Sequence, residues 1–426
     1  MSQVASTNPR VSKMAENLIG SEIIKLAGEI RELIAKGEHI FNFTIGDFDP
    51  KIFPIPTELK DAIIKAYQNG ETNYPPADGI APLRKAVIAS ISERQGLSYG
   101  DNEVLIAGGA RPIIYAIYQA IVDPGDKVVF PVPSWNNNHY THLSHAEQVF
   151  VETKPENNFM PTADELRPLL KGASLLSLCS PLNPTGTAFG KEQLKNICEL
   201  VIAENATRSA EEKPLYVLYD QIYWELTFGE TKHYNPVGLM EQMRPYTIFV
   251  DGMSKAFAAT GVRIGWSFGP KYIIDKMKSI LGHVGAWSPK AEQVAAAEYL
   301  NNKPAVDAYL SEIKGKIEER LHGFYNGIQA LKKEGFNVDA ISPMAAIYLT
   351  VKIDLIGREM PNGQTITTSE QATSYLLNEA KLALVPFKAF GASGNNPWYR
   401  LSVGAASMKD VTDSIESLRA ALKKLK

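Results

Sequence analysis

From about residue 57 onward, short apolar stretches alternate with helical stretches. "NEVLIAGGA" has the pattern of a strand and "PIIYAIYQAIV" that of an apolar helix. The turn "DPGD" and the strand "KVVFPVP" follow. Strands that alternate with helices pair in parallel, because each helix carries the chain back to the starting edge of the sheet. The sequence therefore predicts the α/β class, with a mainly parallel sheet sandwiched by helices.

The length of the chain predicts a second, smaller domain. A chain of 426 residues is long for a single core. Residues 20–36 have helical periodicity, and charged helices near 305–335 precede strands at "AIYLTV" and "WYRLSV". We expect a large domain over residues 57–304 and a small α+β domain built from residues 1–56 and 305–426, with "NNKP" at the second boundary.

Composition and charge exclude several function classes. The net charge of −3 and the pI near 6.2 leave no basic footprint for nucleic acid or for an acidic membrane. Apolar stretches are too short to span a bilayer, and the first residues lack the pattern of a secretion signal. The two cysteines, Cys179 and Cys198, are too few for a disulfide framework. We expect a cytoplasmic protein of enzyme size, with neither nucleic acid nor membrane as partner.

Three histidines, His139, His142 and His145, recur at every third residue. A helix would bring neighbouring members of this series within reach of one another. No cluster of cysteine or carboxylate residues accompanies them, so we expect no metal site.

Unusual residues follow the predicted strands, at the points where these strands end. In a parallel sheet, ligands bind beyond the carboxyl ends of the strands. Residues that are distant in sequence would therefore meet there: Gly109, Ala110, Arg111, Trp135, Asn183, Asp220, Ser254 and Lys255. The sequence predicts a single shared site at this edge.

Lys255 lies among small residues in "DGMSKAFAATGVRIGW", directly after Ser254 and eight residues before Arg263. Nearby positive charge or burial lowers the pKa of a lysine amine and permits imine formation. A hydroxyl at Ser254 and a guanidinium at Arg263 could hold a phosphate. The alternatives are a lysine that meets solvent at a strand end and an arginine in a surface ion pair.

Asp220 and Asn183 could contact the ring of a cofactor. Asp220 ends the apolar run "LYVLYD", where a carboxylate could keep a pyridine nitrogen protonated. Asn183 lies in the tight turn "SPLNPTG", where its amide could donate to a phenolate oxygen. The alternatives are a helix-capping aspartate and a plain turn.

Three further segments offer binding groups. "GGAR" follows a strand and precedes a helix, so its amides form an anion site to which Ser254 and Arg263 could add. Trp135 could stack on a planar cofactor, or could be a core residue. Arg400, inside a late strand, needs a partner if buried, which would be a substrate carboxylate or an internal one.

The segments "SPLNPTG", "YDQIYWEL", "DGMSKAFAATGVRIGW" and "WYRLSVGA", in this order and spacing, resemble the class I and II aminotransferases. Members of this family are pyridoxal 5'-phosphate (PLP) enzymes of fold type I, and the resemblance extends from about "NFTIGDFDP" to the end of the chain. It implies a ping-pong transfer of an amino group between an amino acid and a 2-oxo acid. Lys255 would form the internal aldimine and later move the proton.

The resemblance also implies a role for each remaining residue. Asp220 would pair with the pyridine nitrogen, while Asn183 and Tyr223 would contact the phenolic oxygen. Trp135 would stack on the ring. The phosphate would be held by Ser254, Arg263 and the amides of Ala110 and Arg111, and the substrate α-carboxylate by Arg400 with Gly46 and Asn183 closing around it. Tyr74 would reach the phosphate of the neighbouring subunit, which implies a homodimer with shared active sites.

The substrate is inferred from Arg111. In the bacterial aspartate aminotransferases that this chain resembles, a lysine at the matching position grips the side-chain carboxylate of the substrate, and Arg111 could do so with two parallel bonds. This favours aspartate with 2-oxoglutarate, unless Arg111 faces the phosphate instead. An aromatic or broad-specificity transaminase, a PLP-dependent carbon–sulfur lyase and a non-catalytic PLP-binding regulator are the alternatives.

Overall fold

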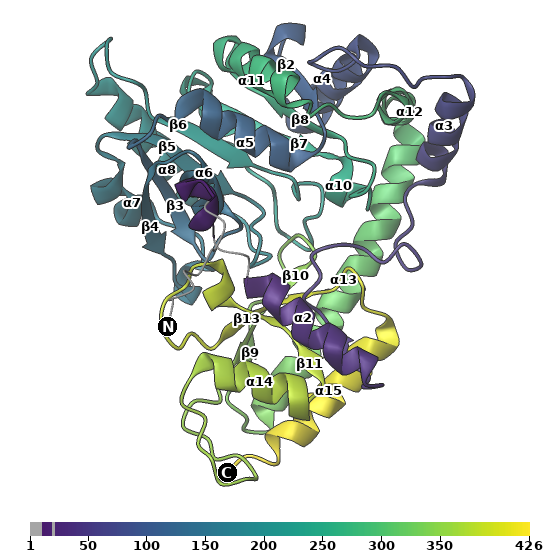
Figure 1. Ribbon diagram of the computed structural model, residues 1–426, viewed down its shortest axis with the longest axis vertical. Helices are drawn as coiled ribbons and strands as arrows, with labels where there is room; N and C mark the ends of the chain where they lie inside the picture. Colours follow the sequence, from purple (N-terminus) through teal and green to yellow (C-terminus); the bar gives the residue numbers. More distant parts are fainter. Residues whose placement is uncertain (1–10, 19–21) are drawn as a thin grey trace, which may run out of the picture.

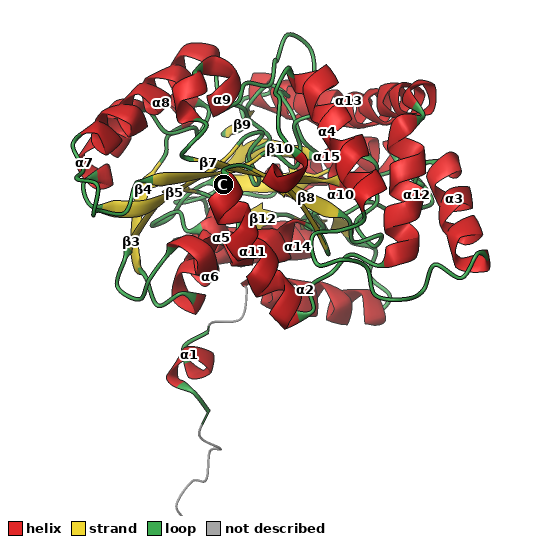
Figure 2. Ribbon diagram, turned by 90° about the horizontal axis from the view of Figure 1, so that it is seen from above, coloured by secondary structure: helices red, strands yellow, loops and turns green. Residues whose placement is uncertain are grey.

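The computed structural model describes residues 11–18 and 22–426. Its centre is a seven-stranded sheet with helices on both faces (Figures 1 and 2). The strand order is β2 (Val104–Ala107), β8 (Gly265–Phe268), β7 (Thr247–Gly252), β6 (Tyr216–Asp220), β5 (Ala173–Cys179), β3 (Lys127–Val132) and β4 (Glu147–Glu152). The strands from β7 to β4 pair in parallel, whereas β8 is antiparallel to both of its neighbours. The predicted α/β class with a mainly parallel sheet is confirmed.

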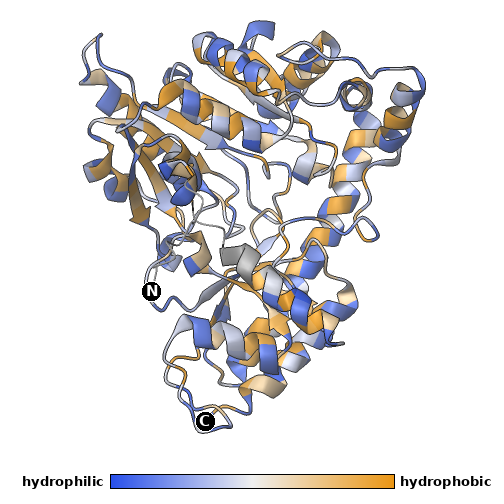
Figure 3. Ribbon diagram, viewed as in Figure 1, coloured by the Kyte–Doolittle hydropathy of each residue, from blue (hydrophilic) through white to orange (hydrophobic). Residues whose placement is uncertain are grey.

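Successive side chains of each strand pack on opposite helical layers. In β6, Val217 and Tyr219 join one core cluster and Leu218 joins the other. The first layer contains α3 (Thr57–Gln68), α4 (Ala81–Gln95), α7 (Ala163–Leu170), α8 (Lys191–Ala206), α9 (Pro236–Leu239) and α12 (Lys290–Asn301). The second contains α5 (Ala110–Ile121), α6 (Asn137–Leu143) and α11 (Lys271–Val284). Burial on both faces explains why these strands read as continuous apolar runs (Figure 3).

A second, smaller sheet lies below the first in Figure 1. It consists of β12 (Val385–Pro386), β13 (Trp398–Ser402), β10 (Tyr348–Ile353) and β9 (Val338–Ala340). Around it lie α2 (Glu22–Ala35), α14 (Ser369–Glu379), α15 (Met408–Leu422) and the paired strands β1 (Phe41–Asn42) and β11 (Leu382–Ala383), while α1 (Lys13–Glu16) lies apart (Figure 2). The predicted helix over 20–36 is found as α2, and its first two residues lie outside the described part.

One long helix, α13 (Lys303–Lys333), connects the two sheets. Val306 and Leu310 in its first turns belong to the core of the large sheet, and Ile313 and Ile317 belong to the core of the small one. The helices expected near 305–335 are therefore a single helix of 31 residues. The domain boundaries at 56/57 and 304/305 stay predictions.

Strand β8 is absent from the sequence expectations. Its four residues, "GWSF", are short and begin with a glycine, so no strand pattern stands out. Gly265 is required by packing, because a Cβ there would lie 2.5 Å from the carbonyl carbon of Gly109. This close approach seats the start of α5 against the sheet.

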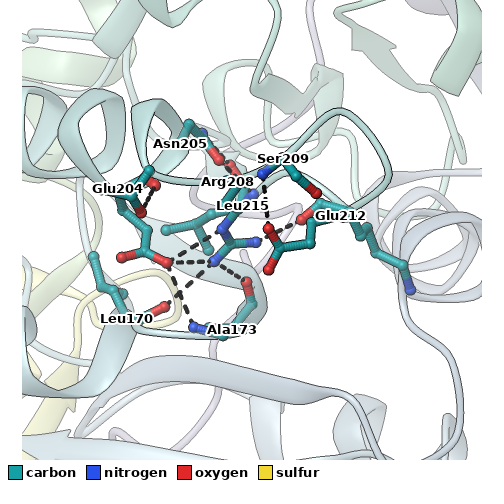
Figure 4. Close-up of polar contacts among 11 residues, drawn as sticks. Leu170, Ala173, Glu204, Asn205, Arg208, Ser209, Glu212 and Leu215 are labelled. Atoms are coloured by element: carbon teal, nitrogen blue, oxygen red, sulfur yellow. Dashed lines mark hydrogen bonds and ion pairs between the residues drawn. The ribbon is translucent and has the colours of Figure 1, made fainter.

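The amino ends of β5 and β6 are held by Arg208, which follows α8 (Figure 4). Its guanidinium donates to the carbonyl oxygens of Ala173 at 2.8 Å and Lys213 at 2.6 Å, and pairs with Glu204. Asn205 exchanges hydrogen bonds with the backbone of Leu215 beside it. Side-chain hydrogen bonds to the backbone thus fix the amino ends of these two strands, opposite to their carboxyl ends.

Within the described residues, no helix is both long and apolar enough to cross a membrane. The same residues contain no group of three or more His, Cys, Asp or Glu side chains that could hold a metal ion. Nε2 of His142 instead lies 2.7 Å from the carbonyl oxygen of Met14. The cytoplasmic location stays a prediction.

We predict that Gly265→Ala destabilises the protein by about 1–3 kcal/mol, because the new methyl group would force backbone apart where β8 meets α5. Urea unfolding followed by circular dichroism measures the change. Gly315→Ala is the control, since a Cβ at this position of α13 meets nothing within 4 Å. The control should gain about 0.5–1 kcal/mol in helix propensity. A Gly265→Ala variant as stable as the wild type would contradict the close packing.

Candidate active site

The carboxyl ends of β5, β6 and β7 open into a cavity of about 680 Å³. This size is typical of a small-molecule site. Among the residues singled out in the sequence, those that line it are Gly46, Ala110, Arg111, Trp135, Asn183, Asp220, Tyr223, Ser254, Lys255, Arg263 and Arg400. Tyr74 does not line it: this residue is 81% exposed and contacts Trp287 edge-on.

Positive charge outweighs negative charge in the lining of this cavity. The cationic residues of the lining are Arg111, Lys255, Arg263 and Arg400, and the anionic ones are Asp47 and Asp220. A cleft with such an excess attracts anions. The expected ligands therefore carry phosphate or carboxylate groups.

The amine of Lys255 follows β7, in the short helix α10 (Met253–Ala256). Its Nζ donates to the carbonyl oxygen of Gly46 at 2.7 Å. Burial lowers the pKa of this amine to about 8, and the carboxylate of Asp47 opposes the shift. Arginine side chains of the cavity lower the pKa as well. The side chain is only partly exposed, unlike a strand-end lysine in open solvent, and with a pKa of about 8 roughly a tenth of its amine is neutral at pH 7.

The carboxyl of Asp220 lies at the last position of β6, beside Cys179 of β5. Burial raises the pKa of Asp220 to about 6, while a hydrogen bond from the amide of Ile222 and the charge of Lys255 lower it. The Ile222 amide donates to Oδ1 at 3.0 Å. The residue is charged above pH 6, so it can pair with a cationic ring nitrogen.

Arg400 is a buried cation, 2% exposed, in β13. Its guanidinium donates to Oδ1 of Asn183 at 3.0 Å and to the carbonyl oxygen of Thr44 at 2.7 Å, and it lies over the ring of Tyr348. Among the described residues, none of the carboxylates forms an ion pair with it, and its Nε has no hydrogen-bond partner. The internal salt bridge considered from the sequence is therefore not formed, and the uncompensated charge requires an anionic ligand.

The start of α5 lies where "GGAR" predicts an anion site, which stays a prediction. No side chain caps this helix, and its N-cap residue, Gly109, has φ +101°. A Cβ on Gly109 would lie 2.3 Å from Nη2 of Arg263, so only glycine fits beside this guanidinium. Arg263 donates to the carbonyl oxygens of Gly108 and Thr260, at 2.7 and 2.8 Å, in place of an ion pair. With buried Ser254 nearby in the lining, the amides and the guanidinium can hold a phosphate.

Asn183 has one orientation that fits its contacts. A guanidinium only donates hydrogen bonds, so the amide oxygen must face Arg400 and the Nδ2 group stays available as a donor. The buried hydroxyl of Tyr223 lies 2.7 Å from that of Tyr348. The Nδ2 group of Asn183 and the hydroxyl of Tyr223 are two donors that suit an anionic oxygen on a bound ring.

Trp135 lies near two guanidinium groups at the cavity wall. The central carbon of Arg111 is 5.5 Å from its ring centroid, and that of Arg400 is 5.9 Å away. Its ring also packs against Phe390. Trp135 therefore packs against a small apolar cluster and also lines the cavity. It has the contacts of a core residue, and its stacking on a cofactor stays a prediction.

Sequence reasoning missed Tyr348, Asp47 and Thr260, which also line the cavity. Thr260 Oγ1 donates to Oδ1 of Asp47 at 2.7 Å. Asp47 lies in "TIGDFDP", where a turn pattern gives no sign that its carboxylate lines a cavity. Tyr348 lies in a strand of apolar residues. Hydrogen bonds from Thr350 Oγ1 to the carbonyl oxygen of Thr185, at 2.7 Å, and from the Ala345 amide to that of Gly186, at 2.9 Å, place this strand against the turn that contains Asn183.

Comparison with known proteins agrees with this geometry. The family model for class I and II aminotransferases matches residues 38–418. The aspartate aminotransferase of Geobacillus stearothermophilus is 30% identical over 412 residues, covering 96% of this chain and 98% of that protein. A probable aspartate/prephenate aminotransferase of Rhizobium leguminosarum bv. phaseoli is 31% identical over 378 residues, 88% of this chain and 90% of that protein.

Solved structures agree as well. The aspartate aminotransferase of Rhizobium meliloti superposes with a TM-score of 0.89 at 27% identity, over 98% of this chain and 100% of that one. The Thermus thermophilus enzyme solved with maleate gives 0.85 at 27% identity, over 97% and 100%. The fold is that of the fold type I aminotransferases. The chain belongs to the class I and II aminotransferase family, and it is an enzyme that transfers amino groups.

We predict that Lys255 reacts with acylating reagents at lower pH than the other lysines. With a pKa of about 8, roughly a tenth of its amine is neutral at pH 7, against less than about a thousandth for an exposed lysine. Labelling of the ligand-free protein with a trace acylating reagent, read by mass spectrometry from pH 6 to 11 (a range of roughly five pH units), measures this. The midpoint should lie near pH 8. A midpoint at or above about pH 10, the range of a free lysine, would overturn the assignment.

Proposed function

We propose that this aminotransferase uses PLP and moves the amino group of aspartate to 2-oxoglutarate. One observation carries the proposal. A depressed-pKa amine, Lys255, and a buried cation without a counter-ion, Arg400, line the same cavity as Asp220. An amine that can form an imine, a site for a carboxylate and a partner for a ring nitrogen are the three groups that amino-acid chemistry on PLP requires.

The residues of the cavity fit PLP. The uncapped start of α5, Ser254 and Arg263 would hold its phosphate, and Gly109 lets the Arg263 guanidinium lie close to the start of this helix. Asp220 would hold the ring nitrogen. When bound, the cofactor supplies a protonated ring that accepts electrons from the substrate Cα–H bond.

The remaining groups orient substrate and cofactor. Nδ2 of Asn183 and the hydroxyl of Tyr223 would donate to the phenolic oxygen of the cofactor. Trp135 would cover one face of its ring. Arg400 would bind the substrate α-carboxylate bidentately, with Gly46 close by, where a Cβ would lie 2.8 Å from the Tyr348 hydroxyl.

Lys255 would bond to the cofactor and, once released, move the proton. Near neutral pH, its Nζ can both accept and return a proton, because a pKa of about 8 lies close to that range. The hydrogen bond to the carbonyl of Gly46 holds the amine at the site before substrate enters. Proton transfer at the substrate Cα is the step that this residue would perform.

Arg111 supports a dicarboxylic substrate. Within the described residues, it forms no ion pair with a protein carboxylate, and its guanidinium lies near the Trp135 ring, as that of Arg400 does. Two cations on the same aromatic ring suit the two carboxylates of aspartate. Relatives named aspartate aminotransferase, and a structural neighbour solved with maleate, a dicarboxylate, support the same choice.

A homodimer with shared active sites completes the proposal. Tyr74 contributes nothing to the cavity of its own chain and projects 81% exposed beside Trp287. A second copy could receive its hydroxyl. The division into a large domain (57–304) and a small domain (1–56 with 305–426) belongs to the same proposal. The two core clusters follow it except at residues such as Val306 and Leu310, which join the cluster of the large sheet, and Leu226 and Phe228, which join that of the small sheet.

We predict that the PLP-loaded protein converts aspartate and 2-oxoglutarate, and that Lys255→Ala lowers kcat by at least about 10⁴-fold. Borohydride reduction followed by mass spectrometry should locate the cofactor on Lys255. Lys276→Ala, at a surface position of α11, serves as the control and should keep wild-type rates. Full activity of Lys255→Ala would refute the mechanism, and release of pyruvate and ammonia without an oxo acid would indicate a lyase.

A second prediction concerns Arg111. Arg111→Ala should lower kcat/KM for aspartate by roughly 10²-fold or more, because a charged substrate group loses its partner. The rate with alanine should fall much less, because alanine lacks the distal carboxylate. Equal losses for both donors would assign Arg111 to the cofactor phosphate, and a panel of amino donors would then identify the substrate.

A further inference from the structure

The loop over residues 221–228, which follows Asp220, joins the two halves of the molecule. Tyr223 in this loop meets Tyr348 of the small sheet, and Leu226 and Phe228 belong to the core cluster of that sheet. The Phe228 amide donates to the carbonyl oxygen of Met344 at 2.9 Å. The position of this loop therefore determines where the Tyr223 hydroxyl lies relative to Asp220.

A charged side chain outside the cavity, that of Arg94, binds this loop. Arg94, at the end of α4, donates from Nε and Nη2 to the two carboxylate oxygens of Glu225, at 2.7 and 3.1 Å. Its Nη1 donates to Oδ1 of Asp307 on α13 at 2.7 Å. One guanidinium thus joins a helix of the large sheet, the loop of Tyr223 and the helix that connects both cores.

The contact with Glu225 differs from an ordinary surface ion pair. The Glu225 side chain is 14% exposed, and burial raises the pKa of its carboxyl while Arg94 lowers it. Separation of the pair would leave the buried carboxylate of Glu225 without a compensating cation. The free-energy cost of that state favours the intact pair. A planar guanidinium satisfies both carboxylates at once, and a lysine ammonium cannot reproduce that fork.

The back of the same loop is fixed to the segment that carries Lys255. The indole Nε1 of Trp224, beside Glu225, donates to Oδ2 of buried Asp251 at 2.8 Å. Asp251 lies in β7, four residues before Lys255. A shift of Glu225 would therefore reach both the Tyr223 hydroxyl and the lysine segment.

We propose that Arg94 is a positioning residue for the transamination site: through Glu225 and Asp307 it holds the 221–228 loop, and hence Tyr223, in place. This role rests on the proposed function of Tyr223 toward the cofactor. Arg94 itself touches neither cofactor nor substrate, since it does not line the cavity. Its loss would leave substrate binding at Arg400 in place and misplace the ring contacts.

Asp307→Asn separates a positioning role from a loss of overall stability. Asp307 is 63% exposed, and an exposed ion pair adds little to the stability of the fold. Glu312→Gln is the matched control: it lies on the same helix, is 62% exposed and pairs with Lys316. Arg94→Lys keeps the charge and removes the fork. The first readout is amide hydrogen exchange of the cofactor-free protein over residues 222–228, compared with β5.

For Arg94→Lys, we expect exchange over residues 222–228 to rise by about tenfold, with β5 unchanged. Asp307→Asn should give a smaller rise and Glu312→Gln none. In the PLP-loaded enzyme, kcat should fall by about tenfold for Arg94→Lys, with KM for the amino donor within about twofold of wild type. A rise in exchange of similar size over residues 222–228 and β5 would overturn the proposal. So would wild-type exchange and wild-type kcat in both Arg94→Lys and Asp307→Asn. Failure of the wild type to bind PLP would instead refute the proposed function. The exchange experiment on the cofactor-free protein would still test whether Arg94 holds the 221–228 loop.

Discussion

The site depends on cations that are held by neutral groups in place of carboxylates. Arg263 donates to two backbone carbonyls, Lys255 to the carbonyl of Gly46, and Arg400 to a carbonyl and an amide oxygen. These oxygens satisfy the donors and fix their directions, yet they leave the charges uncancelled. An anionic ligand would gain the interaction that a protein counter-ion would otherwise have taken, so the charge of the cleft suits phosphate and carboxylate groups.

That arrangement constrains the backbone around it. Carbonyls can approach the guanidinium of Arg263 only because Gly109 lacks a side chain, and the sheet can approach the start of α5 only because Gly265 does. The carboxyl ends of β5, β6 and β7 then converge on the cavity, while Arg208 closes the opposite ends. The same chain segments therefore serve stability at one edge and binding at the other.

Coupling between the two sheets has the same physical basis. The hydroxyls of Tyr223 and Tyr348 meet from opposite sides of the cavity, and Arg400 reaches Asn183 across the same gap. Under the proposed function, the carboxylate site at Arg400 would belong to the small sheet, and most of the groups proposed for the cofactor would belong to the large one. Helix α13 and the 221–228 loop hold these halves together, so residues far from the chemistry can influence it.

Much of the site could be predicted from the sequence because strand ends are easy to recognise. Asp220, Asn183 and Lys255 each follow an apolar run, and a parallel sheet brings such ends to one edge. Tyr348 and Asp47 could not be found in this way, because a tyrosine in a strand and an aspartate in a turn have ordinary structural uses. Strand β8 was missed because four residues that begin with glycine carry no periodic signal.

The sequence by itself determined the layered α/β fold, the strand-end residues and the family, since hydrophobic periodicity and local turn chemistry are encoded in neighbouring residues. Only the tertiary structure decided that Arg400 has no counter-ion among the described residues, that Asn183 turns its oxygen toward it, and that Arg94 joins three distant segments. Those facts depend on which groups meet across long sequence separations, and burial assigns their energies only after the chain has folded.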